Sequence, residues 1–253
     1  MTLNYKKYGT GEPLLILHGL FGSLDNWQTI GKKFAETHAV YLIDLRNHGK
    51  SPHSDDFDYL EMAADVAEIC EEENLTNISL LGHSMGGKTA ITFSVEFPHL
   101  LSKLIIVDIA PKKYRPHHDE ILEGLFSLNL EEITSRRQAD EELSRKITNQ
   151  GIRLFLLKNL KRKEGGGYQW KMNLDLLADQ IEKVIEVSDI PFPINIPTLF
   201  IRGGESGYIL DSDFEEIYKF FPQSEIETIE GTGHWIHAEK PLELLELVEE
   251  FIH

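Results

Sequence analysis

One serine has neighbours whose types and spacing suit nucleophilic catalysis. The segment G-H-S-M-G-G, residues 82–87, follows an apolar run and precedes a helical pattern. In that strand–turn–helix context the G-x-S-x-G motif predicts a sharp, strained turn that lifts the Ser84 hydroxyl above a sheet edge. The glycines leave room for close backbone approach, and the helix directs free N–H groups at the hydroxyl. We therefore predict that Ser84 is a nucleophile.

A tetrahedral oxyanion formed on this serine needs two hydrogen-bond donors. We expect the Met85 backbone N–H, at the start of the helix, to be one donor. The segment L-I-L-H-G-L-F-G-S predicts the other, because its chain turns after an apolar run and the Leu20 N–H can face Ser84. Phe21 is the alternative if the turn is one residue looser. In such a turn His18 is expected to be a structural hydrogen-bonding residue.

The general base must be a histidine near the end of the chain if the order is serine, acid, histidine. The segment G-T-G-H-W-I-H-A-E-K-P offers His234 and His237. We predict His234, because it follows a glycine pair on a loop after a strand, with Trp235 placed to pack beneath it. His237 is expected to be a hydrogen-bonded loop histidine.

The acid is harder to place. In the commonest arrangement it follows the next-to-last strand, here T-L-F-I-R-G-G-E, and the expected position is Ser206, which cannot hold an imidazolium. Glu205 lies one residue early, and Asp211 lies well into the next turn. Asp108 ends the preceding strand, at the edge where catalytic groups of open α/β sheets collect. We predict Asp108 as the acid with Glu205 second, whereas Asp44 is expected to stabilise a turn.

The elements that position these residues alternate between strand and helix. Strand-like runs lie at Leu3–Tyr8, Leu14–Leu17, Val40–Leu45, Ile78–Leu81, Leu104–Ile109, Thr198–Ile201 and Glu225–Ile229. Helical patterns lie at Asn26–Thr37, Tyr59–Glu73, Met85–Phe97, Ser212–Phe220 and Leu242–Phe251. Strand then helix, repeated, predicts an α/β protein with a doubly wound, mostly parallel sheet.

The alternation breaks between Pro111 and Pro197. Helical patterns follow one another there, around Glu120–Leu128, Ser135–Asn149, Ile152–Lys158 and Leu174–Val187, with a G-G-G turn among them. Residues 112–190 hold 14 basic and 14 acidic side chains, whereas the rest of the chain holds 11 and 28. We predict a core domain of residues 1–111 and 191–253, and a helical cap of residues 112–190 that roofs the pocket.

Composition excludes several classes of protein. The 253 residues are 41% hydrophobic and 26% charged, as in ordinary globular proteins. The net charge of −17 disfavours binding to nucleic acid. No apolar run is long enough to span a bilayer, and the first residues do not predict a signal peptide. With Cys70 as the only cysteine, we expect no disulfide, no thiolate metal cluster and a cytoplasmic location.

Five motifs in sequence order resemble the α/β-hydrolase superfamily. They are H-G-L-F-G-S-L-D-N-W, D-L-R-N-H-G-K-S-P, G-H-S-M-G-G-K-T-A, V-D-I-A-P and G-H-W-I-H-A-E-K-P, between about residues 14 and 241. The second and third are narrower than the superfamily and resemble small cytosolic bacterial carboxylesterases and acyl-CoA thioesterases. In that branch the acid comes from the strand position that matches Asp108.

The resemblance implies a sheet of about eight strands with a helical cap inserted after strand six. It implies a Ser-His-Asp hydrolase of short to medium acyl esters, including acyl-CoA thioesters, without cofactor or metal. A basic cluster at residues 112–115 and 158–163 would suit a CoA tail. Carbon–carbon bond hydrolases, lactonases, perhydrolases, lyases and a non-catalytic receptor remain alternatives, and a monomer and a homodimer both stay open. An elbow serine disfavours dehalogenases and epoxide hydrolases, which carry Asp there.

Overall fold

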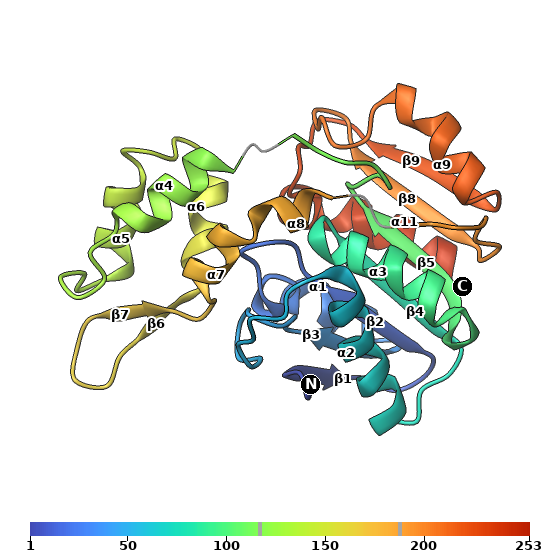
Figure 1. Cartoon of the computed structure of the whole chain (residues 1–253), viewed down its shortest axis with the longest axis horizontal. Helices are drawn as coiled ribbons and strands as arrows, with labels where there is room; N and C mark the ends of the chain where they lie inside the picture. The colour runs from blue at the N-terminus through green and yellow to red at the C-terminus, as the bar shows by residue number, and fades with distance from the viewer. Residues whose placement is uncertain (116–117, 187–188) are drawn as a thin grey trace.

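A single twisted sheet forms the centre of the protein in the computed structural model, which describes residues 1–115, 118–186 and 189–253 (Figure 1). Its strands are β1 (Tyr5–Tyr8), β2 (Pro13–Leu17), β3 (Ala39–Ile43), β4 (Ile78–His83), β5 (Leu101–Val107), β8 (Thr198–Gly203) and β9 (Ser224–Ile229). Their order is β1-β3-β2-β4-β5-β8-β9, and only β1 runs antiparallel to its neighbour. The predicted α/β class and mostly parallel sheet are confirmed.

The sheet has one strand fewer than the number of about eight that the resemblance implies. Within the described ranges the sheet has seven strands, and the long insertion follows the fifth of them rather than the sixth. The seven strands match the seven apolar runs, so the sequence pattern was a better guide to the number than the resemblance.

Helices cover both faces of the sheet. They are α1 (Gln28–Phe34) and α11 (Pro241–Ile252) on one face, and α2 (Tyr59–Glu72), α3 (Met85–Glu96) and α9 (Phe214–Phe220) on the other. Alternate strand residues enter the two cores: in β2, Leu14 and Ile16 face α1 and α11, whereas Leu15 and Leu17 face the opposite helices. Burial on both faces explains the nearly continuous apolar runs.

The insertion between β5 and β8 forms its own layer beside the sheet (Figure 1). It contains α4 (Asp119–Ser127), α5 (Arg136–Leu143), α6 (Gln150–Leu157), the hairpin of β6 (Leu160–Arg162) and β7 (Tyr168–Trp170), α7 (Leu174–Asp179) and α8 (Ile181–Ile185). The sequence missed the hairpin, whose tip is the G-G-G turn with positive φ at all three glycines. The long helix expected up to Val187 is broken at Gln180. Val187, the predicted end of that helix, lies outside the described residues, and so does His117 near the start of the insertion.

Membrane insertion finds no support in the helices. No helix among residues 1–115, 118–186 and 189–253 is long and apolar enough to cross a bilayer.

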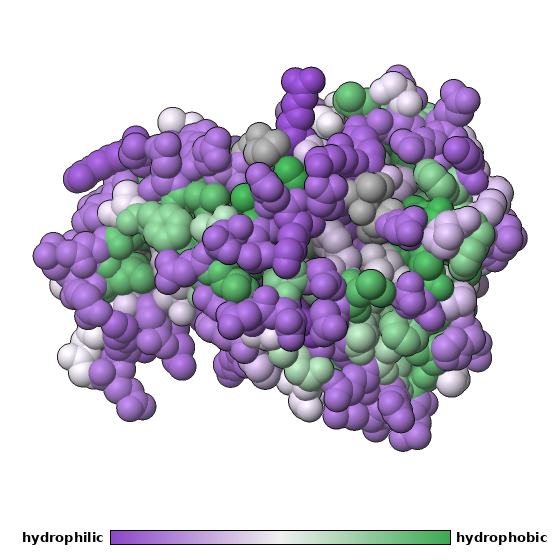
Figure 2. Space-filling model, viewed as in Figure 1, coloured by the Kyte–Doolittle hydropathy of each residue, from purple (hydrophilic) through white to green (hydrophobic). Residues whose placement is uncertain are grey.

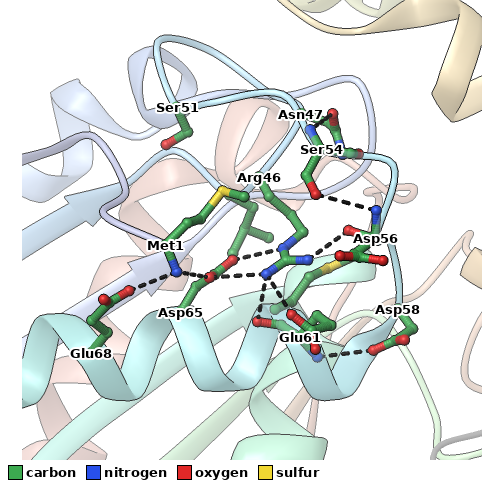
Figure 3. A network of polar contacts seen from close by, with 12 residues as sticks. Met1, Arg46, Asn47, Ser51, Ser54, Asp56, Asp58, Glu61, Asp65 and Glu68 are labelled. Carbon is green, nitrogen blue, oxygen red and sulfur yellow. Dashed lines mark hydrogen bonds and ion pairs between the residues drawn. The ribbon is translucent and has the colours of Figure 1, made fainter.

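A buried ion pair fixes the loop after β3 to helix α2 (Figure 3). The Arg46 guanidinium donates to both carboxylate oxygens of Asp65, from Nε at 2.7 Å and from Nη2 at 3.0 Å, and both side chains are almost fully buried. Arg46 also donates to the carbonyls of Asp56 and Glu61. The Met1 ammonium lies 2.7 Å from the other side of Asp65. Two parallel hydrogen bonds from one guanidinium to one carboxylate fix the orientation of the two groups as well as their separation.

We predict that Asp65→Ala lowers the free energy of unfolding by about 3–5 kcal/mol, because it leaves the buried Arg46 guanidinium with only the half-exposed Glu61 carboxylate as counter-charge. An Arg46→Met, Asp65→Leu double variant should recover most of that loss. The exposed pair of Arg137 and Glu141 provides the control, where Glu141→Ala should change stability by less than about 0.5 kcal/mol. Urea unfolding measures all three, and a loss below about 1 kcal/mol in Asp65→Ala would contradict the account.

Four histidines lie inside the core in their neutral form. Burial lowers the pKa of His18 to about 4 and the pKa values of His48 and His237 to about 3. Burial also lowers the pKa of His83 well below its ordinary value. The His237 ring stacks on Trp27, with 4.6 Å between centroids. Since the unfolded chain protonates histidine near pH 6.5, acid favours the unfolded state.

Because these pKa values are lower in the folded chain, the contribution of the neutral histidines to the unfolding free energy should be complete above about pH 6.5. It should be lost as the pH falls toward 3–4. His237→Phe keeps a ring against Trp27 and removes one titrating group. Between pH 6 and 4 the unfolding free energy of the variant should fall less steeply than that of the native chain. The two slopes should differ by about 1.4 kcal/mol per pH unit. Urea unfolding across this range measures the slope, with the exposed His99→Gln as control. Parallel curves for His237→Phe and the native chain would refute the prediction.

Candidate active site

Ser84 occupies a strained turn between β4 and α3. Its φ of 54° and ψ of −117° are unusual for a residue other than glycine, and holding them costs on the order of 1–3 kcal/mol. The two motif glycines make this possible. A Cβ on Gly82 would lie 2.2 Å from the Gly86 carbonyl oxygen, and one on Gly86 would lie 2.6 Å from that of Leu17. The tight turn that the motif predicts is therefore present at Ser84.

The structure brings Ser84, His234 and Asp108 together in one line. The Nε2 atom of His234 lies 2.9 Å from Ser84 Oγ, and its Nδ1 atom lies 2.7 Å from Asp108 Oδ2. The Asp108 carboxylate accepts from an Nδ1–H, which leaves the Nε2 lone pair facing the serine hydroxyl. All three residues follow carboxyl ends of parallel strands, β4, β5 and β9, and therefore meet at one edge of the sheet.

The Asp108 carboxylate is fully buried and held by two further donors. Oδ1 accepts from the Gly203 N–H at 3.1 Å, and Oδ2 accepts from Ser206 Oγ at 2.5 Å. Ser206, which stands where an acid was first expected, thus donates a hydrogen bond to the acid. The second choice, Glu205, is exposed, and Asp211 pairs with Arg202 at the surface. Neither carboxylate hydrogen-bonds to His234 within the described residues.

Two aromatic residues that sequence reasoning missed hold His234 in place. The Tyr208 ring stacks on the imidazole, with centroids 3.8 Å apart and 12° between planes. His83 Nε2 lies 2.8 Å from the His234 carbonyl oxygen, to which it donates as a neutral imidazole. Trp235, which was expected to pack beneath the imidazole, contacts it edge-on instead, at 76° between planes. His83 is part of the G-H-S-M-G-G motif, so the sequence could have indicated it, whereas no sequence feature indicated Tyr208.

The alternative base does not reach the serine. His237 lies in the short helix α10 (Ile236–Glu239), on the far side of His83, and its ring stacks on Trp27. It was expected to be a hydrogen-bonded loop histidine, but neither ring nitrogen has a partner within the described parts of the chain. The His237 ring is positioned by its stacking on Trp27 instead of by hydrogen bonds.

The turn that contains Leu20 is fixed through a carbonyl. The Gly19 oxygen accepts from the Gly22 N–H at 2.9 Å and from His18 Nδ1 at 2.8 Å. His18 Nε2 accepts in turn from the Leu45 N–H at 3.0 Å, which fixes its tautomer. Because C=O and N–H of one trans peptide point in opposite directions, the Leu20 N–H points away from these groups. His18 therefore has the structural role expected of it.

Two backbone donors remain available beside Ser84. In the part of the chain that the structure describes, the N–H groups of Leu20 and Met85 donate to no protein acceptor. A Cβ on Gly19 would lie only 3.2 Å from Ser84 Cβ, so the turn presses closely against the serine. Leu20, Met85 and Ser84 also border one small cavity. The arrangement can accept a negatively charged oxygen bonded to a carbon on Ser84.

A mostly apolar cavity of about 370 Å³ opens onto Ser84. One wall comes from the sheet edge, through Leu20, Phe21 and Trp235, and the opposite wall comes from the insertion, through Ile152, Phe155 and Leu156. The sequence also indicated apolar side chains of the cap, most of them as core of the cap itself: Leu125, Phe126, Phe155, Leu156 and Trp170. Phe155 and Leu156 line the cavity, whereas Leu125 is buried, Trp170 is partly buried and Phe126 is exposed. No group of three His, Cys, Asp or Glu able to hold a metal occurs among the described residues.

Comparison with known proteins agrees with this geometry. Residues 12–241 match the family described as alpha/beta hydrolase fold. A solved marine microorganism esterase is 43% identical, with 99% of each chain covered and a TM-score of 0.96. An sn-1-specific diacylglycerol lipase of Xenopus laevis, ABHD11, is 38% identical over 96% of this chain and 80% of its own. Esterase YbfF of Escherichia coli is 32% identical over 96% and 93%. The chain belongs to the α/β-hydrolase fold family.

Proposed function

We propose that the protein is a serine hydrolase that cleaves carboxylic esters. The observation that carries the proposal is the continuous line from the buried Asp108 carboxylate through His234 to Ser84 Oγ, with contacts of 2.7 and 2.9 Å. An esterase and a lipase among its relatives support the same reaction class. A receptor that binds without turnover would have no use for a serine held in a strained turn against a base.

The reaction begins when Ser84 Oγ attacks the ester carbonyl carbon and its proton passes to His234 Nε2. The carbonyl electron pair moves onto oxygen, and the N–H groups of Leu20 and Met85 stabilise the resulting negative charge. Asp108 holds the imidazole tautomer and stabilises the imidazolium. His234 then protonates the leaving alcohol, and an acyl-serine remains. Water, deprotonated by His234, attacks this ester, and the bond to Ser84 Oγ breaks as His234 returns the proton to that oxygen and the acid is released.

The insertion acts as a lid over the cavity in this proposal. Residues 1–111 and 191–253 form the catalytic core, and residues 112–190 form the cap. On the core, Lys88 donates to the carbonyls of Ile185 and Glu186, where the insertion returns to the sheet. The face in Figure 2 shows apolar residues gathered over α4, α6 and α7, with polar residues around them. An apolar cavity under such a lid suits acyl chains of short to medium length.

Uncharged esters fit the site better than acyl-CoA thioesters. Three basic residues that were candidates for a CoA tail are paired within the protein: Lys112 with Asp213, Lys113 with Glu186 and Lys163 with Glu131. Burial lowers the pKa of a fourth, Lys158. Since paired cations attract a polyphosphate weakly, these four residues give CoA recognition little support. In the cluster at 158–163, Lys161 and Arg162 are exposed without such a pairing among the described ion pairs.

A cytoplasmic location is part of the proposal. Cys70 is a buried free thiol, and burial raises its pKa to about 12. The thiol therefore stays protonated and unreactive, and it packs as a small apolar side chain.

We predict that Ser84→Ala abolishes hydrolysis of p-nitrophenyl esters, with a loss of more than about 10³-fold in kcat and an unchanged unfolding temperature. The variant removes the attacking atom and leaves the apolar cavity intact. A series from two to twelve carbons run on the native chain would give the chain-length preference. Ser102→Ala is the control, because that hydroxyl bonds to Asn77 and Ile78 at the opposite end of β5. Ester turnover retained by Ser84→Ala would overturn the assignment.

A second prediction separates the two candidate acids. Asp108→Asn should lower kcat about 10⁴-fold, because the amide donates to Nδ1 and forces the imidazole proton onto Nε2. Glu205→Gln should change kcat less than about twofold, since that side chain is exposed and away from the imidazole. Steady-state kinetics on one ester decide the matter. The choice of Asp108 fails if Glu205→Gln is the crippling change.

A further inference from the structure

One side chain of the insertion reaches the turn that contains Leu20. Asn159 follows α6, is fully buried, and donates from Nδ2 to the Phe21 carbonyl oxygen at 2.5 Å. Among the bonds of the described residues, this is the single hydrogen bond that the Phe21 carbonyl accepts. The contact joins residues 138 positions apart in the sequence.

The turn needs an external support because its conformation is unfavourable for its sequence. The Gly22 N–H closes it onto the Gly19 oxygen, which places Leu20 and Phe21 at the two central positions. Phe21 has a φ of 56°, a value that is usual for glycine or asparagine at this position of a turn and unfavourable for other residues. A hydrogen bond to the Phe21 carbonyl opposes relaxation of this residue, and with it of the neighbouring Leu20 peptide.

Asn159 is itself rigidly held by the insertion. Arg136 of α5 donates to the carbonyls on either side of it, those of Leu157 and Leu160, the latter at 2.6 Å. The Lys171 N–H donates to the Asn159 carbonyl at 2.8 Å. The support for the turn is therefore part of the framework of the insertion rather than a mobile side chain.

The other half of the Asn159 amide is left without a partner. Its Oδ1 atom is buried and accepts no hydrogen bond within the described chain. A buried, unsatisfied polar atom lowers stability, and an apolar side chain of similar shape would avoid that cost. Packing therefore does not account for an amide here, whereas the bond to Phe21 does.

We propose that Asn159 is a positioning residue for the oxyanion hole. Its amide holds the Phe21 carbonyl, which keeps the turn in the conformation that directs the Leu20 N–H at the oxyanion. The oxyanion hole is complete only while the insertion is seated on the core, so the insertion contributes to the chemical step as well as to the cavity. This inference rests on the ester hydrolase activity proposed above.

The test compares Asn159→Leu with Asn173→Leu. Leucine matches asparagine in size and cannot donate. Asn173 provides the matched control, because its Nδ2 also joins the insertion to the core, at Asn47 Oδ1 and 3.2 Å, without touching the Leu20 turn. Both variants are measured for kcat and KM on one p-nitrophenyl ester and for unfolding free energy.

An alkyl trifluoromethyl ketone supplies a readout that a purely structural role would not move. Ser84 Oγ adds to the ketone carbon, the serine proton passes to His234, and the carbonyl electron pair becomes an oxyanion between the two N–H groups. For Asn159→Leu we expect kcat to fall and the ketone inhibition constant to rise, each about 10- to 100-fold. KM should change less than about threefold. The variant should remain folded with some loss of stability, because the Phe21 carbonyl loses its hydrogen-bond donor. Asn173→Leu should match the native chain in both readouts.

Three results would overturn the proposal: native kcat and ketone affinity in Asn159→Leu, equal losses in Asn173→Leu, or a loss in KM alone. The ketone titration needs no ester turnover, so it separates this inference from the proposed function. If the native chain binds the ketone but hydrolyses no ester, the reaction class is wrong and the ketone affinities still decide the role of Asn159. If the native chain does not bind the ketone, both proposals fail.

Discussion

The contact between the buried Asp108 carboxylate and His234 Nδ1 is the constraint on which the rest of the site depends. A carboxylate without solvent is tolerable only when it is fully hydrogen-bonded, and Gly203, Ser206 and His234 satisfy it together. The imidazole then has one tautomer and one direction, with its lone pair aimed at Ser84. A parallel sheet provides the framework, because the three residues follow strand ends at one edge.

Buried neutral rings surround the catalytic residues. His83 and Tyr208 hold His234 from two sides, and His18 fixes the turn that contains Leu20. Burial keeps His18 and His83 neutral, so they act as hydrogen-bonding groups and do not compete for the catalytic proton. The same burial makes the fold sensitive to acid, which links the stability of the core to the preorganisation of the site.

Sequence patterns predicted the sheet and helices well, because continuous apolar runs and amphipathic periods reflect local burial. They also led to Ser84, His234 and Asp108 as one group, and the structure places these three in contact. Sequence reasoning failed where contacts are distant along the chain. Tyr208 stacks on a residue 26 positions away, and Asn159 reaches Phe21 across 138 positions, so neither has a local signature. Short strands such as β6 and β7 were missed because three residues carry too little periodicity.

Labelling with a fluorophosphonate, followed by peptide mapping, tests the central claim most directly. The reagent reports the reactivity of a serine without any assumption about the substrate. The account predicts one adduct per chain, on Ser84, formed far more slowly when His234 is replaced by alanine. An adduct on another residue, or a labelling rate that does not depend on His234, would contradict it.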